Sequence, residues 1–138
     1  MKNRKKNIKL SALIIAHNEE KKIYSCLNKL KQVDEIVVVL DKTTDRSKSI
    51  ALNFTKQIYE GSWELEGERR NFGLKKCTSD WILEIDADEH VTNDLLIEIK
   101  KEIITAKPGY FLIPFDNFIG NKRVRYGWGA SWGVSYAP

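Results

Sequence analysis

The stretch WILEIDADE, residues 81–89, joins a short apolar run to three carboxylates. The run is rich in Ile and Leu, which predicts a strand buried in a sheet. If the strand continues through Asp88, its period of two places Asp86 and Asp88 on the same side. Two carboxylates at the carboxyl end of a strand suit Mg²⁺ or Mn²⁺, which keeps waters and takes further ligands from phosphates. The alternative is that Asp86, Asp88 and Glu89 only end the strand in a solvated turn.

The composition is that of an ordinary globular protein. The chain has 138 residues, of which 42% are hydrophobic and 30% charged, and we expect a single domain over residues 1–138. The net charge of +4 is partly due to a basic tail, residues 1–8, which predicts a solvated arm or contact with an anionic membrane surface. No stretch resembles a secretory signal or a membrane span, and the two cysteines form no CxxC pair. We therefore expect a cytoplasmic protein, with possible contact at the inner face of the membrane.

Strands and helices alternate over about the first hundred residues. Strands are expected at residues 9–16, 36–40, 57–59, in the WILEID run and, weakened by Pro114, at 110–115. Helices are expected from Asn18 to about Lys31, from Thr44 or Asp45 to about Phe54, over residues 66–76, and from a Thr92 cap to Lys107-Pro108-Gly109. Residues 117–138 show neither the periodicity of a helix nor that of a strand. The alternation predicts an α/β fold with a mostly parallel, Rossmann-like sheet and helices on both faces.

Three loops that follow predicted strands carry polar residues. They cover residues 16–19, 41–45 and 86–89. In a parallel sheet, such loops meet at one edge. The sequence therefore predicts one crevice lined by these three loops.

Four motifs in their order and spacing resemble the family-2 glycosyltransferases with the GT-A fold. They are ALIIAHNEE (12–20), VVVLDKTTDRS (37–47), ERRNFGLKKC (68–77) and WILEIDADE (81–89), the last as the DxD motif. Within the family, DADE after an RRN helix looks most like the bacterial enzymes that add a sugar, often glucose, to the lipopolysaccharide core. The resemblance covers Leu10 to about Thr105.

The resemblance implies a UDP-sugar site that depends on Mg²⁺ or Mn²⁺. Asp88 would bind the metal, Asp86 would lie beside the ribose or sugar hydroxyls, and Asp41 would accept from the uracil N–H. Arg69 and Arg70 would contact base or phosphate. The remaining donor-binding positions implied by the first motif are Ala16, His17, Asn18 and Glu19.

Several of these residues also have an ordinary structural interpretation. His17 either stacks on the base or simply flanks a helix. One of Arg69 and Arg70 is expected to pair with a surface carboxylate such as Glu66. Asp45 is better explained as a helix cap, and Trp63 as a packing residue rather than a sugar platform.

The resemblance weakens beyond the DxD motif. Inverting transfer needs a general base near the acceptor hydroxyl, and no downstream carboxylate has the expected context, so the catalytic base is not identified. Gly127-Trp128 matches a family landmark, but no acidic residue follows it. We therefore expect the donor-binding part of such an enzyme, a short form or a fragment whose acceptor side is incomplete.

The full prediction is a metal-dependent inverting glycosyltransferase that acts on a bacterial glycan or lipid-linked acceptor, such as the lipopolysaccharide core. One alternative is a non-catalytic module that binds nucleotide and metal. A phosphoryl-transfer enzyme ranks lower, because the motif lies deep in the chain and His90 stands where such enzymes have Thr or Val. A nucleic-acid partner is not expected, since an acidic crevice repels phosphates. The sequence does not predict an oligomeric state.

Overall fold

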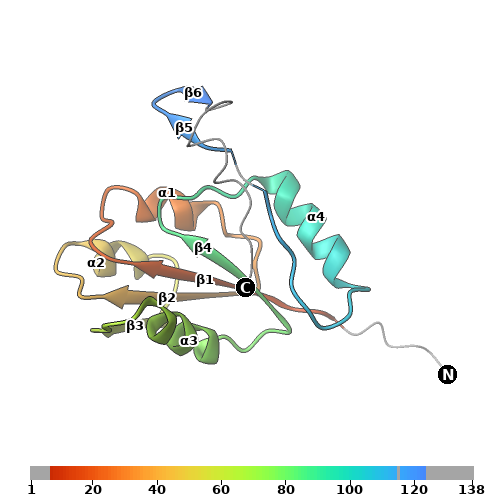
Figure 1. The fold of residues 1–138 in the computed structure, drawn as a ribbon, viewed down its shortest axis with the longest axis horizontal. Coiled ribbons are helices and arrows are strands. Elements are labelled where there is room, and N and C mark those ends of the chain that lie inside the picture. Colours follow the sequence, from red (N-terminus) through yellow and green to blue (C-terminus); the bar gives the residue numbers. More distant parts are fainter. Residues whose placement is uncertain (1–6, 115, 124–138) are drawn as a thin grey trace. The chain divides into compact units, whose positions relative to one another are not determined.

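The structure, a computed structural model, describes residues 7–114 and 116–123 (Figure 1). The chain divides into two compact units, Met1–Thr105 and Ala106–Pro138, and each is described by itself. The single domain expected over residues 1–138 stays a prediction. Most of the basic tail and the Gly127-Trp128 pair lie outside the described residues.

The first unit contains a parallel sheet in the order β3-β2-β1-β4. Its strands are β1 (Leu10–Ala16), β2 (Glu35–Asp41), β3 (Ile58–Gly61) and β4 (Trp81–Asp86). The predicted parallel α/β architecture is confirmed. The third strand begins one residue later than expected and includes Gly61. β2 and then β3 lie on one side of β1, whereas β4 pairs with the other side of β1. The strand order therefore reverses direction between β1 and β4.

Helices cover both faces of this sheet (Figure 1). The chain forms α1 (Ile23–Asn28), α2 (Ser47–Ala51), α3 (Glu66–Lys76) and α4 (Asn93–Ile103). One face packs against α3 through Leu13, Val37 and Val39, all fully buried. Because side chains alternate along a strand, the equally buried Ile14 and Val38 point to the other face, where α1 and α2 lie.

The predicted bounds of α3 are confirmed, and so is the Thr92 cap of α4. The Thr92 hydroxyl accepts a hydrogen bond from the Leu95 N–H at 3.2 Å. Leu96 and Ile103 are buried along α4, as the apolar spacing predicts. No helix in residues 7–114 and 116–123 is long and apolar enough to cross a bilayer.

The first two helices are shorter than expected. Asn18 is not the cap of α1, which begins only at Ile23, with Lys22 in the cap position. The Asn18 side chain instead accepts hydrogen bonds from the backbone of the next polar loop, so tertiary contacts take these residues out of the helix. α2 ends at Ala51, before Phe54.

The described part of the second unit contains a small hairpin. β5 (Phe118–Ile119) pairs antiparallel with β6 (Lys122–Arg123). Gly120 adopts the left-handed φ of 58° that such a tight turn requires. The irregular structure expected from residue 117 is therefore wrong for residues 118–123. The strand expected at 110–115 is also wrong for 110–114, where no partner strand pairs with it; residue 115 is not described.

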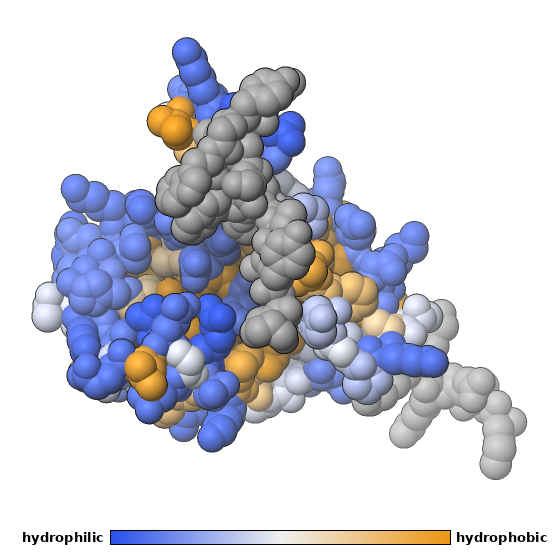
Figure 2. Space-filling view, viewed as in Figure 1, coloured by the Kyte–Doolittle hydropathy of each residue, from blue (hydrophilic) through white to orange (hydrophobic). Residues whose placement is uncertain are grey.

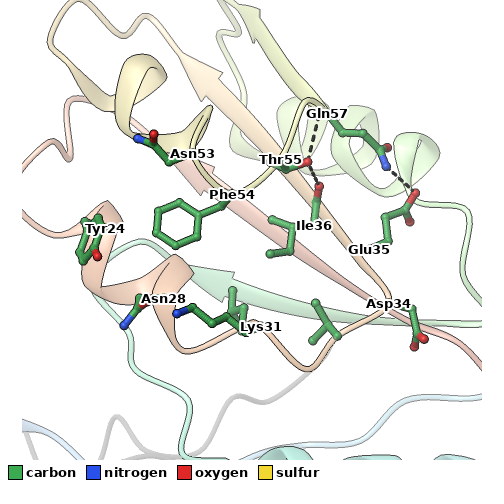
Figure 3. A pocket seen from close by; sticks show the side chains of 12 residues that line it. Tyr24, Asn28, Lys31, Asp34, Glu35, Ile36, Asn53, Phe54, Thr55 and Gln57 are labelled. Carbon is green, nitrogen blue, oxygen red and sulfur yellow. Dashed lines mark hydrogen bonds between the residues drawn. The ribbon is translucent and has the colours of Figure 1, made fainter.

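A hollow of about 870 Å³ lies between α1, α2 and the start of β2 (Figure 3). Tyr24 and Phe54 meet edge to face in its wall, with ring centroids 5.4 Å apart. Glu35 and Ile36, the first residues of β2, also line it. The hollow is therefore at the amino end of the strands, away from the predicted crevice.

Candidate functional site

Three loops leave the carboxyl ends of β1, β2 and β4. In the sheet, Ile15 lies beside Asp86 and Ala16 beside Leu40, so the three strands end at nearly the same level. Ligands of open α/β sheets bind where the strand order reverses, here between β1 and β4. Figure 2 shows mostly hydrophilic side chains at the left of the view, the side on which β1 ends in Figure 1.

The loops after β1 and β2 are held together by direct hydrogen bonds. His17 Nδ1 lies 2.7 Å from the Asp41 carbonyl oxygen. The Thr43 hydroxyl lies 3.3 Å from the carbonyl oxygen of Ala16 and 3.4 Å from the N–H of Asn18, which donates to it. The Asn18 side-chain oxygen accepts from the Thr44 N–H at 2.8 Å.

The same pairing continues along both loops. The Glu19 N–H donates to the buried Ser47 hydroxyl at 3.0 Å, and the Glu20 N–H to Asp45 at 3.0 Å. Asp45 also accepts from the Ser47 N–H at 2.9 Å, but Arg46 occupies the cap position of α2, so the expectation that Asp45 caps this helix is wrong. The β1 and β2 loops therefore form one connected wall at the carboxyl ends of these two strands.

Two residues of this wall adopt a left-handed backbone. Asn18 has a φ of 49° and Lys42 a φ of 48°. Asn tolerates this conformation, whereas Lys adopts it rarely and at a cost of about 1 kcal/mol. The Lys42 N–H donates to the Gly61 carbonyl at 2.8 Å, which holds the strained turn directly after Asp41. Such strain is typical of ligand-binding loops.

Asp41 is buried at the carboxyl end of β2. Its side chain accepts from Arg69 Nη1 at 2.9 Å and from the Trp63 N–H at 3.1 Å. Burial would raise the pKa of Asp41, but the two hydrogen bonds and the charges of Arg69 and Lys42 together outweigh it and hold the pKa below its usual value. Arg69 Nε is buried without a hydrogen-bond partner among the described residues. The pair thus places a charged acceptor beside guanidinium donors.

The other residues around this pair lie on α3 or pack against it. Arg70 points away from Asp41 and pairs with Glu66 at 3.0 Å and Glu84 at 2.5 Å. The expectation that one arginine pairs with Glu66 therefore applies to Arg70. The Trp63 ring lies against Phe72, with centroids 5.1 Å apart, and over Gly61, which is a packing role.

The carboxylates of the third loop occupy the end of β4. The strand ends at Asp86, and Asp88 lies in a turn, so the period of two does not extend to Asp88. Glu89 closes this turn: its N–H donates to the Asp86 carbonyl at 2.9 Å and its carboxylate accepts from the Asp86 N–H at 2.9 Å. Asp86 and Asp88 are both exposed and available to a ligand.

Negative charge is concentrated around this turn. Partial desolvation and the charge of Asp88 raise the pKa of Asp86, and desolvation also raises the pKa of Glu89. Burial and these three carboxylates raise the pKa of the Cys26 thiol to about 12; the thiol lies 3.7 Å from the Asp86 carbonyl. A bound cation would relieve this repulsion.

Lys22 is a residue of the site that the sequence analysis missed. Its ammonium lies 3.8 Å from Glu19 and 3.8 Å from Asp88, so it joins the loop after β1 to the loop after β4. The spacing of three residues between Glu19 and Lys22 is the signal that was present in the sequence.

The carboxylate oxygens at the end of β4 fit a divalent cation whose remaining ligands come from phosphates. No group of three His, Cys, Asp or Glu side chains within residues 7–114 and 116–123 could hold a metal ion alone. Asp88, with Asp86 nearby, offers one or two hard oxygen ligands. Mg²⁺ is usually bound by one or two carboxylates together with substrate phosphates. The site therefore fits a metal that arrives with a phosphorylated ligand.

Comparison with known proteins assigns the family. The model of glycosyl transferase family 2 matches residues 11–130. An uncharacterised glycosyltransferase of Rickettsia typhi is 34% identical over 93 residues, which are 67% of this chain and 32% of that protein. The lipopolysaccharide core biosynthesis glycosyltransferase LpsC of Rhizobium meliloti is 31% identical over 103 residues, which cover 70% and 37% of the two chains. The chain thus spans about a third of the length of these relatives.

Solved structures agree with this assignment. The crystal structure of Staphylococcus aureus TarS, residues 1–349, has a TM-score of 0.56 at 27% identity and covers 68% of this chain and 32% of that one. Glucosyl-3-phosphoglycerate synthase of Mycobacterium tuberculosis, in complex with Mg²⁺ and UDP, has a TM-score of 0.54 at 22% identity over 62% of this chain and 36% of that one, which shows the fold alone. The sheet and its helices have the GT-A fold, and the chain belongs to glycosyltransferase family 2.

Proposed function

We propose that this chain forms the donor site of a metal-dependent, inverting glycosyltransferase that takes a sugar from a UDP-sugar. The acceptor in this proposal is a bacterial glycan or the lipopolysaccharide core, and glucose is the candidate sugar. The LpsC relative supports the acceptor class, and the UDP complexes of structural neighbours support the nucleotide.

One observation carries the proposal. The Asp41–Arg69 pair and the carboxylates at the end of β4 lie at the same edge of one sheet, on opposite sides of the end of β1. Alternation places Asp41 and Asp86 on the face that α3 covers. A nucleotide base at Asp41 would therefore have its phosphates directed across β1 toward Asp88.

The family resemblance implies the roles of these residues, and their chemistry supports the roles. Each oxygen of Asp41 keeps a free lone pair beyond its protein hydrogen bond, so the carboxylate can accept from the N–H of uracil. His17 is exposed at the rim, where its ring can stack on the base. Asp86 would accept from hydroxyl groups of the ribose or sugar. Ala16, Asn18 and Glu19 would form the backbone of the pocket wall.

Asp88 would hold Mg²⁺ or Mn²⁺ together with the diphosphate. When bound, such an ion acts as a Lewis acid that neutralises the departing diphosphate. The described carboxylates after the DxD motif include Asp94, Glu98 and Glu102, all exposed on α4. None is assigned as the general base, which must lie within hydrogen-bond reach of the acceptor hydroxyl.

The test is calorimetric titration of UDP into the full chain, with and without Mn²⁺. We expect binding that depends on Mn²⁺ and that Asp88→Ala weakens at least about tenfold, because the variant removes the metal ligand. Glu98→Ala on α4 is the matched control and should bind like the wild type. If the wild type does not bind UDP with Mn²⁺, the proposal fails.

A module that binds the donor without transferring sugar is the second candidate. It is favoured by the fact that no carboxylate among the described residues is assigned as the general base. Slow hydrolysis of UDP-glucose that Asp88→Ala abolishes would support catalysis, whereas binding with no hydrolysis or transfer would favour the module.

We also propose that the reaction takes place at the cytoplasmic face of the inner membrane. The support is the basic tail, with Lys2, Lys5 and Lys6 close together in the sequence. Replacing these three lysines with Gln should weaken binding to vesicles that contain anionic lipids. Unchanged binding would exclude this part of the proposal.

A further inference from the structure

We propose that Lys22 binds the diphosphate of the donor, an inference that rests on the proposed function. Lys22 directly precedes α1, and its side chain is 54% exposed. Its ammonium lies 3.8 Å from carboxylate oxygens of both Glu19 and Asp88. The positive charge is thus located between the β1 and β4 loops, where the strand order reverses.

The two contacts of Lys22 hold it only weakly. Both distances exceed the 2.7–3.2 Å of an ordinary N–H···O hydrogen bond, so the pairing is by charge alone. Exposed ion pairs of this kind contribute little to stability. The ammonium can therefore turn to a stronger anion at little cost.

The arginines at this edge have closer partners. Arg69 lies 2.9 Å from the buried Asp41, and Arg70 lies 2.5 Å from Glu84. Releasing Arg69 would leave the Asp41 charge buried without its cation, which is unfavourable. Lys22 is therefore the better placed of these three cations to bind a new anion near Asp88.

A diphosphate next to Asp88 needs a second cation. One divalent ion does not neutralise a diphosphate, and Asp86, Asp88 and Glu89 add further negative charge. A metal bound by Asp88 would place phosphate oxygens beside the carboxylate that Lys22 already faces. Lysine binds phosphate as a compact point charge, which suits this position. In the free protein, Lys22 partly neutralises Asp88; with donor bound, it faces the diphosphate.

The experiment compares UDP with uridine, both in the presence of diamagnetic Mg²⁺, on the full chain. Calorimetry measures UDP binding, and NMR titration measures uridine binding. Lys22→Gln should weaken UDP binding about tenfold and leave uridine binding unchanged, because uridine has no diphosphate. Lys22→Arg should retain most of the UDP affinity. Lys21→Gln is the matched control: it makes the same charge change at the neighbouring exposed lysine and should bind UDP like the wild type.

Three results would overturn the inference. UDP binding by Lys22→Gln that equals or exceeds that of the wild type would mean that Lys22 is only a counter-ion of Asp88. An equal loss of UDP and uridine binding would mean that Lys22 supports the fold of the loop. Equal weakening by Lys21→Gln would mean a general effect of net charge. Failure of the wild type itself to bind UDP would instead overturn the proposed function. In the three results above the wild type binds UDP, so failure of the inference and failure of the proposed function are distinguishable.

Discussion

At Asp41, burial and hydrogen bonding act on one carboxyl group in opposite directions. The residue is 6% exposed, and burial alone would raise its pKa. The Arg69 guanidinium and the Trp63 N–H stabilise the charged form and lower the pKa below its usual value. Asp41 therefore stays ionised at neutral pH, which is the state that accepts a hydrogen bond from a nucleobase.

The two neighbouring arginines should differ in their effect on stability. Arg69→Gln leaves the Asp41 carboxylate buried without its cation, so we expect the free energy of unfolding to fall by about 2 kcal/mol. Arg70→Gln removes ion pairs of an arginine whose side chain is 46% exposed, so its effect should be below about 1 kcal/mol. Urea unfolding at pH 7 measures both. Equal losses in the two variants would contradict the distinction between a buried and an exposed pair.

At the scale of the elements, α3 lies unusually close to the sheet at Gly73. A Cβ atom built at Gly73 would lie 2.7 Å from Leu13 Cδ1 and 3.1 Å from Val39 Cγ2, both in the buried core. Glycine is unfavourable inside a helix, but at Gly73 the lack of a side chain lets α3 pack closely against the sheet. The same approach brings Arg69, one helical turn earlier, onto Asp41 at the end of β2.

Alanine at the two glycines of α3 should act in opposite directions. Gly67→Ala has open space around it and should raise the free energy of unfolding by up to about 1 kcal/mol through helix propensity. Gly73→Ala should lower it by about 1–2 kcal/mol, because Leu13 or α3 must move. Thermal and urea unfolding of the two variants measure the difference. A Gly73→Ala variant as stable as Gly67→Ala would show that α3 does not pack as closely as described.

At the scale of the whole molecule, lowered carboxyl pKa values connect stability to pH. Desolvation opposes the shift at Glu35, Asp41 and Asp45, but hydrogen bonds outweigh it and lower all three pKa values. A folded pKa below the unfolded value gives stability that is present above the unfolded pKa and is lost as the pH falls through the folded pKa. The raised pKa values of Asp86 and Glu89 have the opposite effect: their ionisation above the unfolded pKa lowers the free energy of unfolding.

We therefore expect the three groups with lowered pKa values to lose their contribution to the free energy of unfolding below about pH 4. Glu35→Gln tests one contribution, because Glu35 accepts hydrogen bonds from Gln57 and from the Thr78 N–H and hydroxyl. The variant should be about 1 kcal/mol less stable than the wild type at pH 7, and the difference should close in acid. Glu98→Gln on α4 serves as an exposed control. A Glu35→Gln difference that persists at pH 3 would contradict this account. Urea unfolding over a pH series measures both variants.

The sequence by itself determined the class of fold and the positions of the polar loops. Apolar runs such as residues 36–40 and 81–86 are local patterns, and alternation with helices dictates a parallel sheet whose strand ends meet at one edge. The bounds of α3 and the Thr92 cap of α4 were also readable, because helix ends depend on neighbouring residues. Membership of the glycosyltransferase family followed from the order and spacing of four motifs and is confirmed by comparison.

Only the tertiary structure decided which partners the site residues have. Asn18 resembles a helix cap in sequence, but its side chain accepts a hydrogen bond from the Thr44 N–H of the neighbouring loop instead of capping α1. α1 therefore begins only at Ile23. Neighbouring arginines are equivalent in a motif, yet the direction of each side chain on α3 assigns Arg69 to Asp41 and Arg70 to Glu66 and Glu84.

The position of Lys22 beside Asp88 was likewise not predictable. Its contact joins residues 66 positions apart in the sequence, and such contacts exist only after β4 has paired with β1. The physical reason is the same in each case. Secondary structure follows from local periodicity, whereas hydrogen bonds and ion pairs between loops depend on distances that the packed sheet sets.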